Sequence, residues 1–189
     1  MPDWSDRGYV MATRDQSVVY CRVVGVGNMN NCTAFQIFTE RMFAAGYREF
    51  VVDFSTCHGL DSTFLGVLLG IALGDRKTGA HVVVVNASHG LRKALHEVGI
   101  DRLLDICPEV VDPPEVPLCR LEVEQENPKR RIGLIVRAHE DLCSIDAANE
   151  SRFGRFLELM RAELAAGAGA GAHPPHREDP SDATTPPGS

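Results

Sequence analysis

Short runs of apolar, β-branched residues alternate with amphipathic stretches over roughly the first 110 residues, and no other feature constrains the fold of this chain as strongly. The runs at 17–26, 50–54 and 81–85 have the length and composition of buried strands. Between the first two, the stretch 33–45 places its apolar residues three and four apart, as on one face of a helix. Helices of this length return the chain to a largely parallel sheet. The pattern predicts an α/β fold, with a mixed, largely parallel sheet flanked by helices.

Residues that cap helices mark where the later elements begin and end. The loop 55–59 leads to Asp61 and Ser62, either of which can accept the N-cap hydrogen bond of a second helix that extends to Gly74. Ser88 is placed to cap a third helix, and Gly99 to end it. A last short strand is expected within Leu103 to Cys107.

The remaining sequence has a different character. Residues 15–110 form the predicted globular domain, preceded by an N-terminal segment at 1–14. An acidic, proline-containing linker at 111–137, with at most one short strand, leads to an amphipathic helix at 138–166 and a disordered tail at 167–189. The apolar stripe on 138–164 must pack on this domain or on another copy, which makes a homo-oligomer possible through this helix.

Composition and charge exclude several classes of protein. The formal net charge is −7 and the only basic cluster is Lys129 to Arg131, so nucleic acid is not an expected partner. The longest apolar stretch, Leu65 to Leu73, is far shorter than the roughly 20 residues that span a bilayer, so no membrane insertion is expected. Six cysteines are scattered without paired spacing or a secretory leader, which predicts reduced thiols in the cytoplasm.

One segment carries a resemblance to a known family. VVDF at 51–54, followed by LDSTFLGVLL at 60–69, closely resembles the central motif of STAS domains, which occur in anti-sigma factor antagonists and sulfate transporters. Gly66 follows the family pattern, whereas Phe64 stands where the family usually has glycine. Residues 81–86, 90–95 and 99–104 are similar to the following strand and helix and to the closing segment, so the resemblance covers about 15–107.

The resemblance implies a regulatory function centred on Ser62. In anti-sigma factor antagonists the matching serine is phosphorylated by a partner that is both anti-sigma factor and serine kinase, which releases the antagonist, and a serine phosphatase reverses the modification. Partner binding is then expected around Asp61, Ser62, Thr63, Phe64 and Gly66, with Thr63 as the alternative acceptor. Judged from the residues alone, the run at 61–63 also fits a purely structural helix start, and Asp61 could cap the helix, orient the hydroxyl or assist recognition by a kinase.

Other groupings of reactive residues are weak. Cys57 and His58 adjoin without the geometry of a nucleophile and its base, and His89 and His96 share a helix face without a third ligand. His173 and His176 lie in the tail, where no preorganised site is expected.

We therefore expect a binding module rather than an enzyme, with no metal and no cofactor. Two alternatives remain open. One is a STAS scaffold subunit that assembles through the 138–164 helix. The other is a soluble STAS subunit of a transport system that docks on an ATPase.

Overall fold

A computed structural model describes residues 8–15, 17–78, 80–122 and 127–169. Six strands form one sheet in the order β5-β4-β3-β2-β1-β6. Strands β2, β3, β4 and β5 pair in parallel with one another, whereas β1 runs antiparallel to both β2 and β6. The predicted mixed, largely parallel sheet is confirmed. The strands are β1 (Tyr9–Asp15), β2 (Val18–Gly27), β3 (Glu49–Leu60), β4 (His81–Val85), β5 (Asp105–Ile106) and β6 (Cys119–Arg120).

The sheet is larger than the predicted strands at two places. β3 continues to Leu60, through residues expected to form a loop, because their backbone keeps pairing with β2 after two register shifts. β1 lies in the segment expected before the domain, and it pairs along its whole length with β2. Val10 and Ala12 of β1 are buried, so this strand belongs to the core. Period-2 alternation over only seven residues is a weak signal in sequence, and tertiary pairing decided it.

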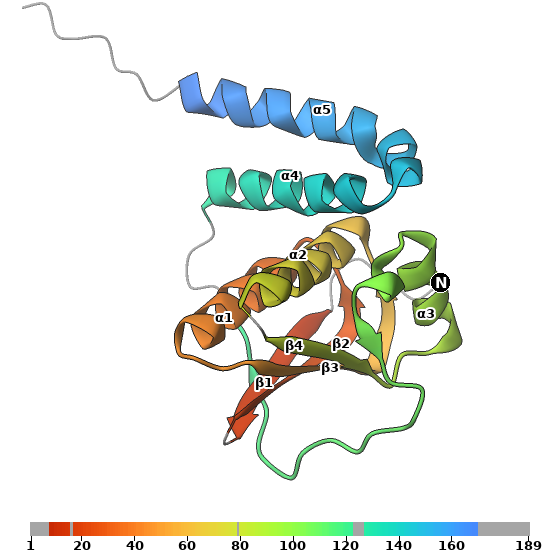
Figure 1. The fold of residues 1–189 in the computed structure, drawn as a ribbon. Helices are drawn as coiled ribbons and strands as arrows, with labels where there is room; N and C mark the ends of the chain where they lie inside the picture. Colours follow the sequence, from red (N-terminus) through yellow and green to blue (C-terminus); the bar gives the residue numbers. More distant parts are fainter. Residues whose placement is uncertain (1–7, 16, 79, 123–126, 170–189) are drawn as a thin grey trace, which may run out of the picture.

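Helices α1 (Cys32–Ala44) and α2 (Ser62–Thr78) cover one face of the sheet, and α3 (His89–Glu97) leads into the 3-10 turn η1 (Ile100–Arg102) (Figure 1). Ser88 caps α3 as predicted, its hydroxyl accepting the Leu91 N–H at 3.3 Å. Gly99 follows α3 with φ of 78°, a left-handed conformation that glycine adopts without steric cost.

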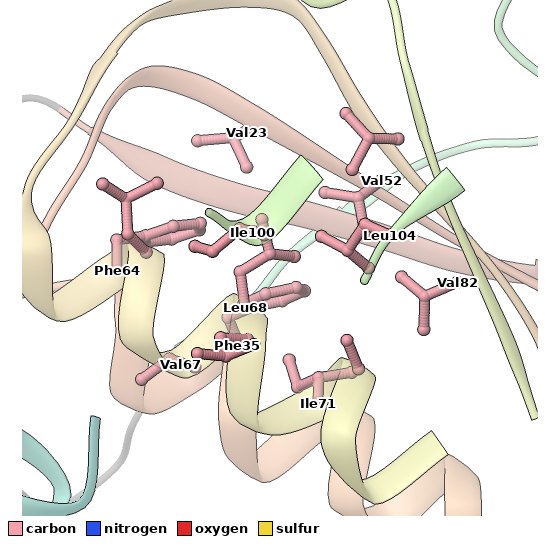
Figure 2. Close-up of a cluster of buried hydrophobic side chains, with 14 of the residues drawn as sticks. Val23, Phe35, Val52, Phe64, Val67, Leu68, Ile71, Val82, Ile100 and Leu104 are labelled. Atoms are coloured by element: carbon pink, nitrogen blue, oxygen red, sulfur yellow. The ribbon is translucent and has the colours of Figure 1, made fainter. Parts of the chain in front are cut away.

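The core lies between α2 and the sheet. Phe64, Leu68 and Ile71 of α2 point toward Val23 of β2 and Val52 of β3 (Figure 2). All five side chains are buried, and each fully buried aliphatic or aromatic side chain contributes roughly 1.5–3 kcal/mol to folding. This packing fixes the direction of α2 and thus the position of its first turn.

Two helices stand where the sequence predicted the end of a linker and one helix. α4 (Pro128–Ile145) and α5 (Ala147–Gly169) form a hairpin; α4 packs on α2, and α5 lies on the far side of α4 (Figure 1). The single helix expected at 138–166 is therefore wrong, as is the linker over 128–137.

Local capping explains both differences. The Asn127 side chain accepts the N–H groups of Lys129 and Arg130, and Pro128 occupies the first turn, so α4 begins early. Asp146 has an extended backbone and its side chain accepts the Ala148 N–H at 2.9 Å, so the chain reverses there. β6 is the short strand expected in the linker. Most of the predicted tail, 170–189, lies outside the described residues, and no described helix is long and apolar enough to cross a membrane.

Candidate functional site

Asp61 caps the first turn of α2. Its Oδ1 accepts the backbone N–H of Phe64 at 2.8 Å, and its Oδ2 accepts the N–H of Met29 at 2.9 Å. The Asp61 N–H donates to the Gly27 carbonyl at 2.9 Å, which ties the start of α2 to the end of β2. Of the roles that the sequence left open for Asp61, the structure shows the capping role. The helix start therefore leaves the hydroxyl of Ser62 available for another partner.

That partner is His139, on α4. Its Nε2 lies 3.0 Å from the Ser62 Oγ, and its Nδ1 lies 2.8 Å from the Ile135 carbonyl oxygen. A carbonyl can only accept, so Nδ1 carries the proton and a neutral imidazole presents Nε2 as an acceptor. The Ser62 hydroxyl therefore donates to His139. Burial lowers the pKa of His139 and favours this neutral form; the hydrogen bond to Ile135 and the charge of Asp61 oppose the effect.

The two residues after Ser62 face inward. Thr63 is 5% exposed and Phe64 is completely buried, whereas Ser62 is partly exposed. The Phe64 ring stacks on Phe35 with the ring centroids 5.4 Å apart and the planes 2° from parallel. The phenylalanine that replaces the usual glycine of the motif is thus directed into the core (Figure 2).

Gly66, one turn further along α2, lies under α4. A Cβ atom built on Gly66 would lie 2.2 Å from the carbonyl oxygen of Ala138, closer than real Cβ atoms approach any atom. The absence of a side chain therefore permits the two helix backbones to meet. Ser62 and Gly66 are brought together on the side of α2 that faces α4, while Thr63 and Phe64 lie on its core side.

Asp53 of β3 is the centre of a buried hydrogen-bonded cluster that ties neighbouring strands together. Its carboxylate is completely buried and accepts hydrogen bonds from Tyr20 Oη (2.5 Å), Arg22 Nε (2.7 Å), Asn86 Nδ2 (2.8 Å) and the Ser55 hydroxyl (2.8 Å). Burial alone would raise the pKa of Asp53, but these hydrogen bonds together hold it below its ordinary value. The same burial and the hydrogen bond to Asp53 raise the pKa of Tyr20 to about 12. This cluster joins β2, β3 and the end of β4.

The other reactive residues do not form a site. Cys57 is buried with its Sγ 3.3 Å from the Gly59 carbonyl oxygen, and burial raises the pKa of the thiol, which disfavours a nucleophilic thiolate. His96 pairs with Asp101 at 2.7 Å. Within the described part of the chain, no three His, Cys, Asp or Glu side chains are grouped to hold a metal ion. His173 and His176 lie outside the described residues.

Sequence reasoning missed His139 and all of α4 before residue 138. The available signals were Asn127 followed by Pro128, a common helix start, and the spacing of Ile135, His139 and Leu142 on one face. A histidine on an apolar face indicates a buried polar contact, but it does not reveal that the contact is Ser62.

Comparison with known proteins gives the family. A family model described as "Mlab, STAS domain" matches residues 10–105. This chain belongs to the STAS family. The matched range begins in β1 and ends at β5, so the STAS domain comprises most of the sheet with α1 to α3. The α4–α5 hairpin lies beyond it.

Solved structures with the same general fold share little sequence with this STAS chain. An anti-sigma factor antagonist from Mycobacterium paratuberculosis is 22% identical, with a TM-score of 0.47, over 56% of this chain and 89% of that one. The phosphorylated form of the Bacillus cell fate determinant SpoIIAA is 16% identical, with a TM-score of 0.44, over 52% and 90%. The murine Solute Carrier 26 family member A9 anion transporter is 14% identical, with a TM-score of 0.41, over 55% and 21%. No curated protein sequence matches the chain significantly.

Proposed function

We propose that this chain is a phospho-regulated protein-binding module of the anti-sigma factor antagonist type. It binds an anti-sigma factor serine kinase, is released when Ser62 is phosphorylated, and is restored by a serine phosphatase. In this proposal the chain is not an enzyme and needs no cofactor. The observation that carries the proposal is that Asp61, and not Ser62, caps α2, so the partly exposed residue Ser62 stands at the helix N-terminus with a hydroxyl that has no capping role.

The chemistry of that position suits a phosphate switch. A phosphoserine adds about −1.5 to −2 charges, and the N-terminus of a helix stabilises an anion by roughly 0.3–1 kcal/mol, so the modified domain stays folded. In a docked interface the same dianion must be desolvated, and a cost of about 3 kcal/mol weakens binding more than a hundredfold. Release then requires no change of fold. Ser62 is a better acceptor than Thr63, because Thr63 is almost completely buried.

The test is phosphorylation of the full chain by the anti-sigma factor serine kinase encoded nearest to its gene, followed by phosphopeptide mapping. We expect phosphate on Ser62 in the natural chain and in Thr63→Val, and none in Ser62→Ala. Ser88→Ala is the matched control, since Ser88 also stands at a helix start but caps α3 with its hydroxyl.

Binding of the kinase supplies a second readout. Ser62→Ala should keep its affinity for the kinase, and Ser62→Asp should lose affinity. Equal affinities of the two variants would overturn the switch. Binding to an ATPase of a transport system without phosphorylation would instead favour the alternative transport subunit.

A second candidate function is a scaffold. On α5, Leu159 is 61% exposed and Phe156 is 41% exposed, so the outer helix presents apolar surface that the described residues leave uncovered. Such a surface suits assembly through the hairpin.

A further inference from the structure

The hairpin lies on the same surface of α2 that the proposed switch requires. Ser62, Gly66 and Gly70 recur every four residues and form one stripe of small side chains along α2. Each meets α4: Ser62 through its hydrogen bond to His139, Gly66 through the Ala138 backbone, and Gly70 beside Asp141, whose Oδ2 would lie 3.0 Å from a Cβ. The stripe is therefore a packing surface for a helix, and α4 occupies it.

His139 closes this contact directly over the candidate phosphorylation site. The side chain is 1% exposed, and its ring packs against Phe153 and Phe156 of α5, with centroid distances of 5.4 and 4.7 Å. With α4 packed on α2, the Ser62 hydroxyl donates a hydrogen bond to a buried imidazole of α4. A kinase would have to approach the same first turn that α4 covers.

The contact combines apolar packing with polar contacts at its edges. Leu134, Ala138 and Leu142 contribute apolar contacts to the domain core. At the edges of the contact, however, Arg131 Nη2 donates to Asn30 Oδ1 at 2.6 Å, and Arg130 lies 3.9 Å from Glu40. Beside them a groove of about 260 Å³ remains open between α1, α2 and α4. Interfaces with polar edges within one chain permit relative motion more readily than wholly apolar ones.

We propose that the α4–α5 hairpin is an internal ligand of the α2 surface, which a protein partner of Ser62 must displace. The proposal rests on the proposed function, because it concerns access to the same serine. The external partner would present a helix with a small residue where it crosses Gly66, as α4 presents Ala138. Phosphorylation of Ser62 follows displacement of the hairpin.

The test uses a substitution on α4 that detaches this helix from α2 and leaves the sequence of α2 unchanged. Ala138 is 3% exposed at the crossing, so Ala138→Arg cannot be accommodated with α4 seated. Ala165→Arg is the matched control, since it adds the same side chain at an exposed alanine of α5. Hydrogen exchange of the full-length chains is measured first. In Ala138→Arg, amides of α4 and of the first turns of α2 should exchange about tenfold faster or more, while β3 and β4 keep their protection and report an intact domain.

The initial rate of Ser62 phosphorylation by the kinase named above is the second readout. This rate should rise about tenfold in Ala138→Arg and stay unchanged in Ala165→Arg. The rate should be proportional to the fraction of molecules in which the hairpin is detached from α2. If Ala138→Arg unfolds, His139→Ala is the substitute, because it removes the hydrogen bond to Ser62 with less disruption of packing. The phosphorylation rate should then rise by a smaller factor.

The outcomes separate the two proposals. If hydrogen exchange shows that α4 is detached in Ala138→Arg, yet Ser62 is phosphorylated at the rate of the natural chain, the proposal that the hairpin blocks Ser62 is wrong. The proposed function is unaffected by that result. Absence of phosphate on Ser62 in every variant, the opened one included, overturns the proposed function.

Discussion

At the scale of single residues, two polar side chains show how burial sets chemistry in this protein. Asp53 remains a buried anion because it receives hydrogen bonds from Tyr20 and Arg22 of β2 and from Asn86 at the end of β4. Burial lowers the pKa of His139 and favours the neutral imidazole, and the Ile135 carbonyl keeps the proton on Nδ1. One group stabilises the sheet, and the other holds the hydroxyl on which the proposed switch depends.

Asp53→Asn should destabilise the domain in a pH-dependent way. The substitution leaves Arg22 facing a neutral amide, and loss of one member of a buried ion pair costs about 3–5 kcal/mol. Because the folded pKa of Asp53 is lowered, its contribution is complete above the unfolded value of about 3.9 and is lost as pH falls through the folded value.

Urea denaturation between acidic and neutral pH measures this effect. The difference in unfolding free energy between Asp53→Asn and the natural chain should be largest near neutral pH and shrink in acid. Asp112→Asn, at an exposed aspartate, is the control and should show little difference at any pH. A pH-independent loss in Asp53→Asn would show that packing, and not the charge, is responsible.

At the scale of elements, the two sides of α2 make different contacts. Its apolar side, with Phe64 and Leu68, fills the core, and its small side, with Ser62 and Gly66, receives α4. Sequence periodicity revealed the apolar side because burial repeats every three or four residues. The small side left no such signal, since glycine within a helix has several explanations and its contact with Ala138 joins distant parts of the chain.

Gly66→Ala should separate α4 from α2. In an exposed helix interior, alanine is more stable than glycine by roughly 0.8–1 kcal/mol, but here the added Cβ meets the Ala138 carbonyl. Gly74→Ala is the matched control on the same helix, because no described atom outside the adjoining backbone of α2 lies within 4 Å of its Cβ position.

Thermal denaturation and hydrogen exchange test this pair of substitutions. Gly74→Ala should raise the melting temperature, whereas Gly66→Ala should not, and amides of α4 should exchange faster only in Gly66→Ala. Unchanged α4 protection in Gly66→Ala would contradict the close helix contact.

At the scale of the whole molecule, successive layers run from the sheet through α2 and α4 to α5 (Figure 1). The outermost layer exposes Leu159 and Phe156, although Phe156 also packs its ring near His139. Assembly through α5 would therefore be coupled to the contact between His139 and Ser62.

If the scaffold role holds, Leu159→Arg should convert an oligomer into a monomer in sedimentation velocity, because it places a charge within the apolar contact. Ser151→Arg adds the same side chain at an exposed position earlier in α5 and should leave the mass unchanged. A natural chain that sediments as a monomer over the micromolar range would remove self-assembly from its proposed functions.

The sequence alone identified the STAS family and most of its domain, because alternating strands, helix caps and the motif at 60–69 are encoded by neighbouring residues. It identified Ser88 and Gly99 as helix boundaries and Ser62 as the candidate phosphorylation site. Only the tertiary structure assigned the capping of α2 to Asp61 and turned Phe64 inward. It also placed His139 over Ser62, a contact between residues 77 positions apart. Such a contact depends on how α4 packs on α2, and no local pattern in the chain records that packing.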